Sequence, residues 1–201
     1  MAERHRTAER LIEAGLVLFA ERGIDATPIV KIEAAAGLAP GSGAFYKHFR
    51  SKQELLDAAI ADATVSTATG TDVLDAIGPL NLTDQATLIA RGTWAMLDTH
   101  RELFLVLHRE HRHRPWDFGD DPTKWPGSGP AAVARWLAAL TDTGRLDVSD
   151  PDALAVLLLD GLVAFWRRCQ TDGDAPQGID KERIIAAWIH LVVAMATTPS
   201  G

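Results

Sequence analysis

Apolar residues recur at helical spacing along most of this 201-residue chain, and no segment alternates apolar and polar residues as a strand would. The spacing predicts a first helix that ends near Gly23, where glycine takes the left-handed conformation readily. Thr27 followed by Pro28 reads as the N-cap and the first position of a short second helix that ends at Gly37. The pattern therefore predicts an all-α fold.

The segment GLAPGSGAFYKHFRSKQELL, residues 37–56, places three glycines and a proline before an aromatic and basic stretch. Ser51 and Glu54 form a capping box, which predicts that another helix starts there. Phe45 and Phe49 are four residues apart and are expected to anchor a short third helix to the core. Three short helices, the third entered through a tight turn, make a helix-turn-helix unit whose last helix has the width of the DNA major groove. The residues that then point away from the core are Tyr46, Lys47 and His48.

The run FAERGIDATPIVKIEAAAGLAPGSGAFYKHFRSKQELL resembles the N-terminal domain of the TetR family of bacterial transcriptional repressors, over about residues 7–60. The resemblance implies an all-helical homodimer whose helix-turn-helix domains enter the two halves of a palindromic double-stranded DNA operator. It also implies that a small molecule in the C-terminal domain releases the DNA. The expected division is a helix-turn-helix DNA-binding domain at 1–55 and a helical ligand-binding and dimerisation domain at 56–201.

The resemblance implies that Thr27, Tyr46 and Lys52 bind phosphate and that residues 42–48 face bases. The DNA-binding residues expected on this basis are Thr27, Lys31, Ser42, Gly43, Ala44, Tyr46, Lys47, His48 and Lys52. The chain departs from the commonest family pattern in about two extra residues within residues 39–42. Ala44 stands where threonine is usual, and Val30, beside Lys31, stands where a basic residue is frequent.

The net charge of −7 is unevenly distributed, because residues 1–55 carry a net +1 and the remainder carries −8. Basic residues near the N-terminus can therefore meet phosphate although the whole chain is acidic. Net charge neither requires nor excludes DNA binding.

All six tryptophans lie beyond the predicted DNA-binding domain. Residues 113–129 contain three prolines and three glycines, and connections this long often act as lids. We therefore expect a pocket for a small apolar or aromatic effector. Its expected lining is Trp94, Phe104, His108, Trp125, Trp136, Phe165 and Cys169.

The last two predicted helices, at about 151–171 and 180–197, carry apolar residues on more than one side. Such an excess is expected when one side packs on the domain and the other on a twofold partner. The pattern predicts a homodimer through these two helices, as does the resemblance.

The remaining features argue against other classes of protein. The single Cys169 excludes an intrachain disulfide, and no apolar run is long enough to span a membrane, so a cytoplasmic protein is expected. His108 and His111 share a helix face, but we expect neither a metal nor a cofactor, and no nucleophile or phosphate-cradle motif indicates an enzyme. Two alternatives stay open: a helical small-molecule-binding or protein-interaction module without operator binding, and a helical metalloenzyme.

Overall fold

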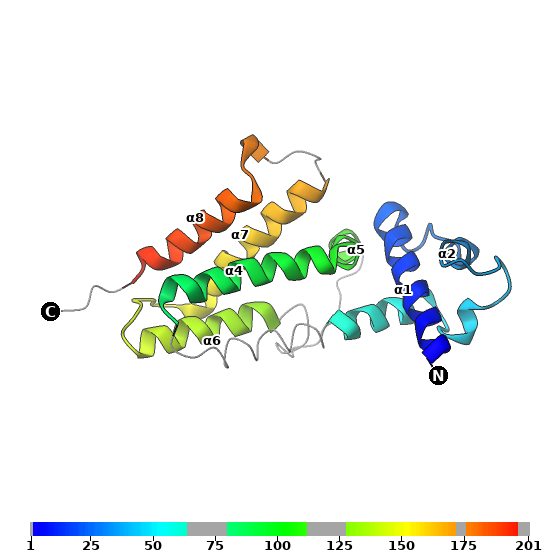
Figure 1. Cartoon of the computed structure of the whole chain (residues 1–201), viewed down its shortest axis with the longest axis horizontal. Coiled ribbons are helices and arrows are strands. Elements are labelled where there is room, and N and C mark those ends of the chain that lie inside the picture. The colour runs from blue at the N-terminus through cyan, green and yellow to red at the C-terminus, as the bar shows by residue number, and fades with distance from the viewer. Residues whose placement is uncertain (1, 64–79, 112–127, 172–175, 197–201) are drawn as a thin grey trace. The chain divides into compact units, whose positions relative to one another are not determined.

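The computed structural model describes residues 2–63, 80–111, 128–171 and 176–196 (Figure 1). Contacts within the chain divide it into two compact units. The first comprises Met1–Val65 and His100–Asp117, and the second comprises Ser66–Thr99 and Phe118–Gly201. This division places a helix from beyond residue 100 in the first unit, which the expected domains at 1–55 and 56–201 did not.

The first unit is built on α1 (Ala2–Arg22), which packs against α2 (Ile29–Ala35) and α5 (Arg101–His111). A 3₁₀ turn, η1 (Phe45–Lys47), contacts α2, and residues 52–63 form a further helix. The helices enclose a small apolar core, whose fully buried side chains include Leu11, Phe19, Ile32, Phe45, Leu55 and Leu56. This core is the base on which the turn between α2 and η1 rests.

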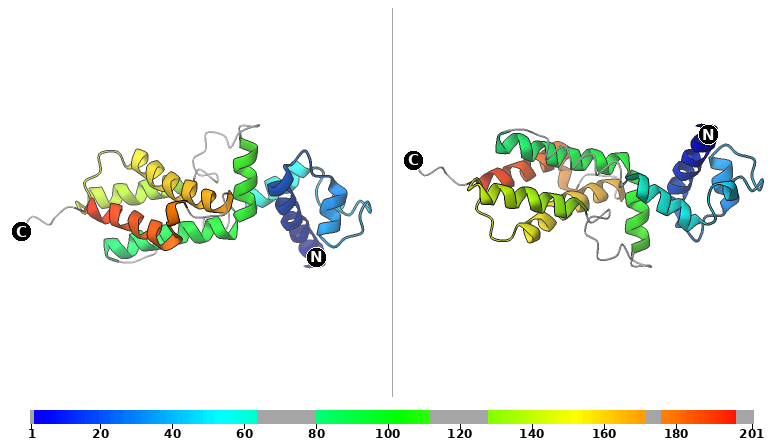
Figure 2. Two further views of the ribbon diagram at one scale, coloured as in Figure 1. Left: turned by 90° about the horizontal axis from the view of Figure 1, so that it is seen from above. Right: turned by 90° about the horizontal axis from the view of Figure 1, so that it is seen from below.

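The second unit contains α4 (Leu82–Thr99), α6 (Ser128–Asp142), α7 (Pro151–Thr171), the 3₁₀ turn η2 (Pro176–Gly178) and α8 (Lys181–Ala194). Helix α7 packs against α4, α6 and α8, and α4 also packs against α8 (Figure 2). The expected two-sided apolar pattern is present on both final helices. On α7 Leu158 and Leu162 are buried while Leu157 is exposed, and on α8 Trp188 is buried while Leu191 is exposed.

The described residues form helices and turns but no strand, apart from an isolated bridge between Leu146 and Ala196, so the all-α prediction is confirmed. The predicted end of the first helix at Gly23 is also confirmed, since Gly23 has a φ of 88°. The predicted N-cap at Thr27 is wrong: α2 follows Pro28, and no side chain caps it.

The third helix of the expected helix-turn-helix is a single 3₁₀ turn of three residues. Gly43, with a φ of 72°, cannot belong to a right-handed helix, and Ser51 already caps the next helix by accepting from the Glu54 amide. Only a few residues are left between these two points. They form one turn, in which Phe45 O accepts from the amides of His48 and Phe49. No helix in the described ranges is both long and apolar enough to cross a membrane.

Candidate nucleic-acid interface

The turn between α2 and η1 is set by backbone conformations that favour glycine. Gly41 has a φ of 75°, and the Ser42 amide donates to Ala39 O at 3.2 Å. Pro40 followed by a glycine with positive φ is the signature of a type II turn. A Cβ on Gly41 or Gly43 would meet no atom within 4 Å, so conformation rather than space requires glycine here.

Two phenylalanines hold η1 against the core, as the sequence predicts. Phe45 is fully buried and Phe49 nearly so, and their ring centroids lie 5.8 Å apart. Between them, Tyr46 is 61% exposed and its ring meets that of Phe45 edge-on. Lys47 and Ser42 are exposed, while Gly43 and Ala44 are partly exposed. The turn therefore presents Ser42 to Lys47 at the surface of the first unit.

Glu33 is the residue of this site that the sequence analysis missed. It lies on α2 and is 1% exposed. Its carboxylate accepts from the Gly41 amide at 2.7 Å and from the Phe45 amide at 3.0 Å, so one side chain binds both ends of residues 41–45. The available signal was a charged residue directly after inward-facing Ile32 and three residues before Ala36 on a short helix.

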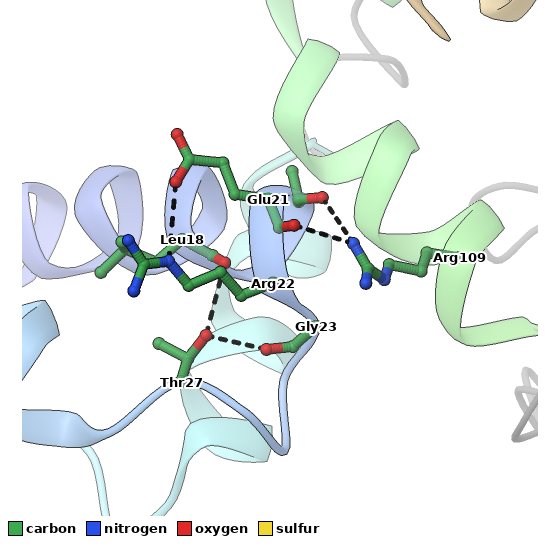
Figure 3. A network of polar contacts seen from close by, with 7 residues as sticks. Leu18, Glu21, Arg22, Gly23, Thr27 and Arg109 are labelled. Atoms are coloured by element: carbon green, nitrogen blue, oxygen red, sulfur yellow. Dashed lines mark hydrogen bonds and ion pairs between the residues drawn. The ribbon is translucent and has the colours of Figure 1, made fainter.

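Thr27 lies inside the first unit rather than at its surface. Its side chain is buried, and its hydroxyl donates to Gly23 O at 2.8 Å, with Leu18 O at 3.3 Å (Figure 3). Leu18 lies in the last turns of α1, and Gly23 directly follows the helix. Thr27 therefore connects the start of α2 to the end of α1.

Lys52 also binds the loop between α1 and α2. Its Nζ donates to the carbonyls of Ile24, Asp25 and Thr27, the last at 3.1 Å. An ammonium has three N–H donors, and these three carbonyls can occupy all of them. The lysine thus holds the loop between α1 and α2 in place while its charge stays beside Thr27.

Helix α5 contributes a third set of contacts to the end of α1. Arg109 Nη1 donates to Ala20 O and Glu21 O, each at 3.1 Å (Figure 3). Glu110 accepts from the Ile24 amide at 3.3 Å. A cation at a helix C-terminus also interacts favourably with the helix dipole. Residues more than eighty positions away therefore help fix the scaffold of the turn.

A second group of basic residues lies beside η1. Arg4 of α1 donates to Lys47 O at 3.1 Å, and Arg4, Thr7, Lys47 and His48 border a shallow depression of about 780 Å³ together with Glu3. Partial burial of His48, and then the charges of Arg4 and Lys47, hold its pKa below the ordinary value of 6.5. His48 is therefore neutral at physiological pH, although a nearby anion would favour its charged form.

The expected effector residues are divided between the two units. Phe104 and His108 lie on α5 in the first unit, and Trp125 lies outside the described residues. In the second unit Trp94 is buried and its ring centroid is 6.3 Å from that of Phe165. Trp136 is partly exposed and donates to Gln85, and Cys169 is partly exposed on α7.

Trp166 was not expected in this group, and it is fully buried. Its indole N–H donates to Asp98 at 2.7 Å. Asp98 also pairs with Lys181 at 3.6 Å, and the Lys181 ammonium lies 5.5 Å from the centroid of the Trp94 ring. The described residues contain no group of three His, Cys, Asp or Glu side chains arranged to hold a metal ion.

Comparison with known proteins agrees with this geometry. Residues 11–59 match the family model described as bacterial regulatory proteins of the tetR family. No curated protein matches the chain. Solved structures with the same fold include a regulatory protein of the tetR family from Rhodococcus RHA1, with a TM-score of 0.72 and 21% identity over 94% of this chain and 96% of that one.

Two further structures share the fold over nearly the whole chain. CprB, a TetR family protein from S. coelicolor A3(2), has a TM-score of 0.72 and 20% identity over 98% of this chain and 92% of that one. SmeT, the repressor of the Stenotrophomonas maltophilia multidrug efflux pump SmeDEF, has a TM-score of 0.66 and 19% identity over 96% and 91%.

These identities concern the fold, whereas the family model matches the helix-turn-helix sequence itself. TetR-family proteins are DNA-binding regulators rather than enzymes. The matched segment contains the buried phenylalanines, the exposed turn, and Thr27 and Lys52, which bind carbonyls near the end of α1. Residues 11–59 therefore match the TetR family of bacterial regulatory proteins, and the chain shares its fold with solved structures from that family.

Proposed function

We propose that this regulator is a ligand-responsive repressor of transcription that acts in the cytoplasm. A homodimer binds a palindromic operator, and a small apolar or aromatic effector releases it. The observation that carries this proposal is the exposed turn from Ser42 to Lys47 on a buried phenylalanine anchor, within the segment that matches the family. A rigidly held, exposed element is what reading base edges requires.

The residues proposed for DNA contact fall into two groups. Lys31, Ser42, Gly43, Ala44, Tyr46, Lys47 and His48 are at least partly exposed and are assigned direct contacts. Thr27 and Lys52 are assigned an indirect role, because Thr27 is buried and the donors of Lys52 meet backbone carbonyls. For Lys52, the positive charge still adds long-range attraction to phosphate.

The dimer is proposed to form through α7 and α8. Leu157 is 72% exposed, Leu191 is 53% exposed and Val156 is also exposed, which is unusual for large apolar side chains on two adjacent helices. Burying them against a second copy would remove this apolar surface from water. A twofold dimer also places two reading elements on one operator, which a palindrome requires.

The effector is proposed to bind among the aromatic side chains of the second unit. Trp94 and Phe165 form an aromatic pair there, and rigid rings are well suited to an apolar ligand. A structure of SmeT is described as a complex with triclosan, an aromatic compound, which supports an effector of this chemical class. Phe104, His108, Trp125, Trp136 and Cys169 remain proposed effector contacts.

The test of the proposed function is selection of bound sequences from a pool of random DNA duplexes by the purified full chain at a stated salt concentration. An enriched palindromic sequence is expected, because phosphate contacts alone would enrich nothing. Tyr46→Phe should weaken binding to all sequences alike, by about tenfold for a lost charged hydrogen bond. Lys47→Ala should instead change the preferred sequence.

Arg135→Ala is the matched control, because Arg135 is an exposed cation on α6 in the second unit. It removes one positive charge and should leave the enriched sequence unchanged. If the wild-type chain enriches no sequence, operator binding is excluded. The alternative of a helical binding module without an operator would then be favoured.

A further inference from the structure

We propose that Glu33 is a positioning residue for DNA recognition: its buried carboxylate holds residues 41–45 in the conformation that reads the operator. This inference rests on the proposed function and names a residue that controls the specificity of the same site. Glu33 itself does not touch DNA in this proposal. It acts through the backbone of the turn.

Burying the carboxylate of Glu33 is energetically unfavourable unless its hydrogen bonds compensate. A carboxylate is rarely buried unless it is paired or fully hydrogen-bonded, because it loses its hydration. Among the described residues, Thr27 and Glu33 are the two polar side chains that are buried, and none of the described ion pairs includes Glu33. A negative charge beneath a DNA-binding surface also opposes phosphate binding.

The hydrogen bonds explain what this carboxylate does. Oε2 accepts from the Gly41 amide at 2.7 Å and Oε1 accepts from the Phe45 amide at 3.0 Å. Each oxygen therefore holds one end of the segment that contains Ser42, Gly43 and Ala44. Hydrogen bonds from backbone amides to a charged acceptor are among the stronger ones in proteins.

The turn needs such a support because its own hydrogen bonds are local. The Ser42 amide donates to Ala39 O, and the Ala44 amide donates to the Ser42 hydroxyl at 3.3 Å. Neither bond connects the segment to α2. Gly41 and Gly43 both have positive φ and no side chain, so they lose more conformational freedom on ordering than other residues.

The consequence concerns specificity more than affinity. Contacts to phosphate tolerate small displacements, whereas discrimination between bases depends on accurate placement of donors and apolar groups in the groove. If the carboxylate sets this placement, its loss should lower the preference for the operator over random DNA. Affinity for random DNA should stay almost unchanged.

The experiment compares the wild-type chain with Glu33→Met and Glu33→Gln. Methionine has a similar length and removes both acceptors, while glutamine keeps one acceptor oxygen. The first measurement is amide hydrogen exchange of Gly41 and Phe45 by NMR on the protein without DNA. In Glu33→Met both amides should exchange about tenfold faster or more, because both lose their acceptor.

The second measurement is the affinity for the sequence enriched by the wild-type chain, divided by the affinity for a random duplex at the same salt concentration. We expect this ratio to fall about tenfold in Glu33→Met and less in Glu33→Gln, with random-duplex affinity within about twofold of wild type. Glu54→Gln is the control: it also loses a carboxylate that accepts a backbone amide, that of Arg50, but outside the turn. Its ratio should match that of the wild type.

The outcomes are distinct. A wild-type ratio in folded Glu33→Met, or unchanged exchange of both amides, would overturn the inference while the proposed function stands. If Glu33→Met does not fold, Glu33→Gln decides by the same two measurements. Failure of the wild-type chain to enrich any sequence would overturn the proposed function itself, and the inference with it.

Discussion

The two units of this chain are stabilised by different kinds of contact. In the first unit, side chains from distant positions bind backbone groups: Thr27, Lys52 and Arg109 bind carbonyls near the end of α1, and Glu33 binds two amides of the turn. In the second unit, large apolar side chains fill the space between helices, and tryptophan N–H groups mostly meet side chains, as Trp166 meets Asp98.

This difference corresponds to what each unit is proposed to do. Hydrogen bonds are directional. The side chains that bind backbone groups in this way, here called clamps, therefore fix the position of a loop that has little apolar surface of its own. Packing of apolar side chains is non-directional and tolerates rearrangement better. The first unit is therefore suited to reading DNA, and the second is suited to adapting to a ligand and to a second copy.

The largest expected effect comes from Phe45→Ala, which tests whether the turn depends on its apolar anchor as well as on the clamps. Phe45 is fully buried beneath the turn, and a phenylalanine-to-alanine change in a core costs about 3–5 kcal/mol. We expect denaturant unfolding of the first unit, followed by far-ultraviolet circular dichroism, to shift by this amount. Operator binding should be lost.

Tryptophan fluorescence separates the two units in the same titration. Five of the six tryptophans lie within the sequence ranges of the second unit, and none lies before residue 94. The fluorescence transition should therefore stay close to that of the wild type in Phe45→Ala. An equal shift of both transitions would show that the two units unfold together and do not differ in stability.

The sequence predicted the parts of each unit that local signals determine. Gly23 ends α1, and Ser51 caps the next helix. Each signal acts within a few residues, so it can be read without the fold. The apolar spacing likewise predicted the buried Phe45 and Phe49.

The clamps could not be predicted in this way, because each joins positions that only the fold brings together. Arg109 and Ala20 are 89 residues apart, and Lys52 and Thr27 are 25 apart. Thr27 looked like a helix cap by its place before Pro28, but in the folded chain the end of α1 provides its hydroxyl with acceptors. Glu33 gave only the weak signal of a charged residue directly after the buried Ile32 on a short helix.

The next effect tests the second unit. Leu157→Asp places a charge in the proposed dimer surface, where Leu157 is largely exposed in a single chain. Burying an unpaired charge is strongly unfavourable, so we expect the dimer to weaken by about 2–4 kcal/mol, with little change in the fold. Sedimentation over a range of concentrations measures this.

Thr143→Asp provides the matched control, since Thr143 is exposed and lies after α6, outside α7 and α8. It should leave the mass unchanged. If Leu157→Asp sediments like the wild type, the apolar surface of α7 is not the dimer contact. The view that the second unit uses apolar surface for assembly would then fail.

A smaller effect is expected at the clamp from α5. Arg109→Ala removes donors to Ala20 O and Glu21 O, and loss of partly solvated charged hydrogen bonds costs about 1 kcal/mol. Arg22→Ala is the control, because Arg22 only approaches Glu21 at 3.9 Å on the surface (Figure 3). Such an exposed pair contributes about 0–0.5 kcal/mol.

Both variants lose one arginine that lies beside the end of α1, so the difference between them separates the hydrogen bonds to backbone carbonyls from the loss of net charge. Thermal unfolding of the first unit, followed by circular dichroism, gives the two values. Equal effects would mean that directional binding of carbonyls contributes nothing beyond charge. Arg109 would then no longer count, beside Thr27 and Lys52, as a residue that stabilises the first unit by binding backbone carbonyls.

The smallest effect concerns His48, at the edge of the proposed DNA surface. Burial, Arg4 and Lys47 hold its pKa below 6.5 in the free protein, and a phosphate nearby would favour the charged imidazole. A group with a higher pKa in the complex takes up a proton on binding, so affinity should rise as the pH falls from about 8 towards 5. The increase in affinity should stop at the pH where His48 is also protonated in the free protein.

His48→Gln should remove this pH dependence, and His190→Gln, on exposed α8 surface in the second unit, should keep it. Measuring operator affinity at several pH values and constant salt gives the number of protons taken up on binding. This number should not exceed one for each chain in the complex. A slope that persists in His48→Gln would assign the proton to another group. If the affinity instead decreases as the pH falls, then burial and the two cations lower the pKa of His48 in the complex more than the phosphate raises it. His48 would then lie near the DNA without contacting a phosphate.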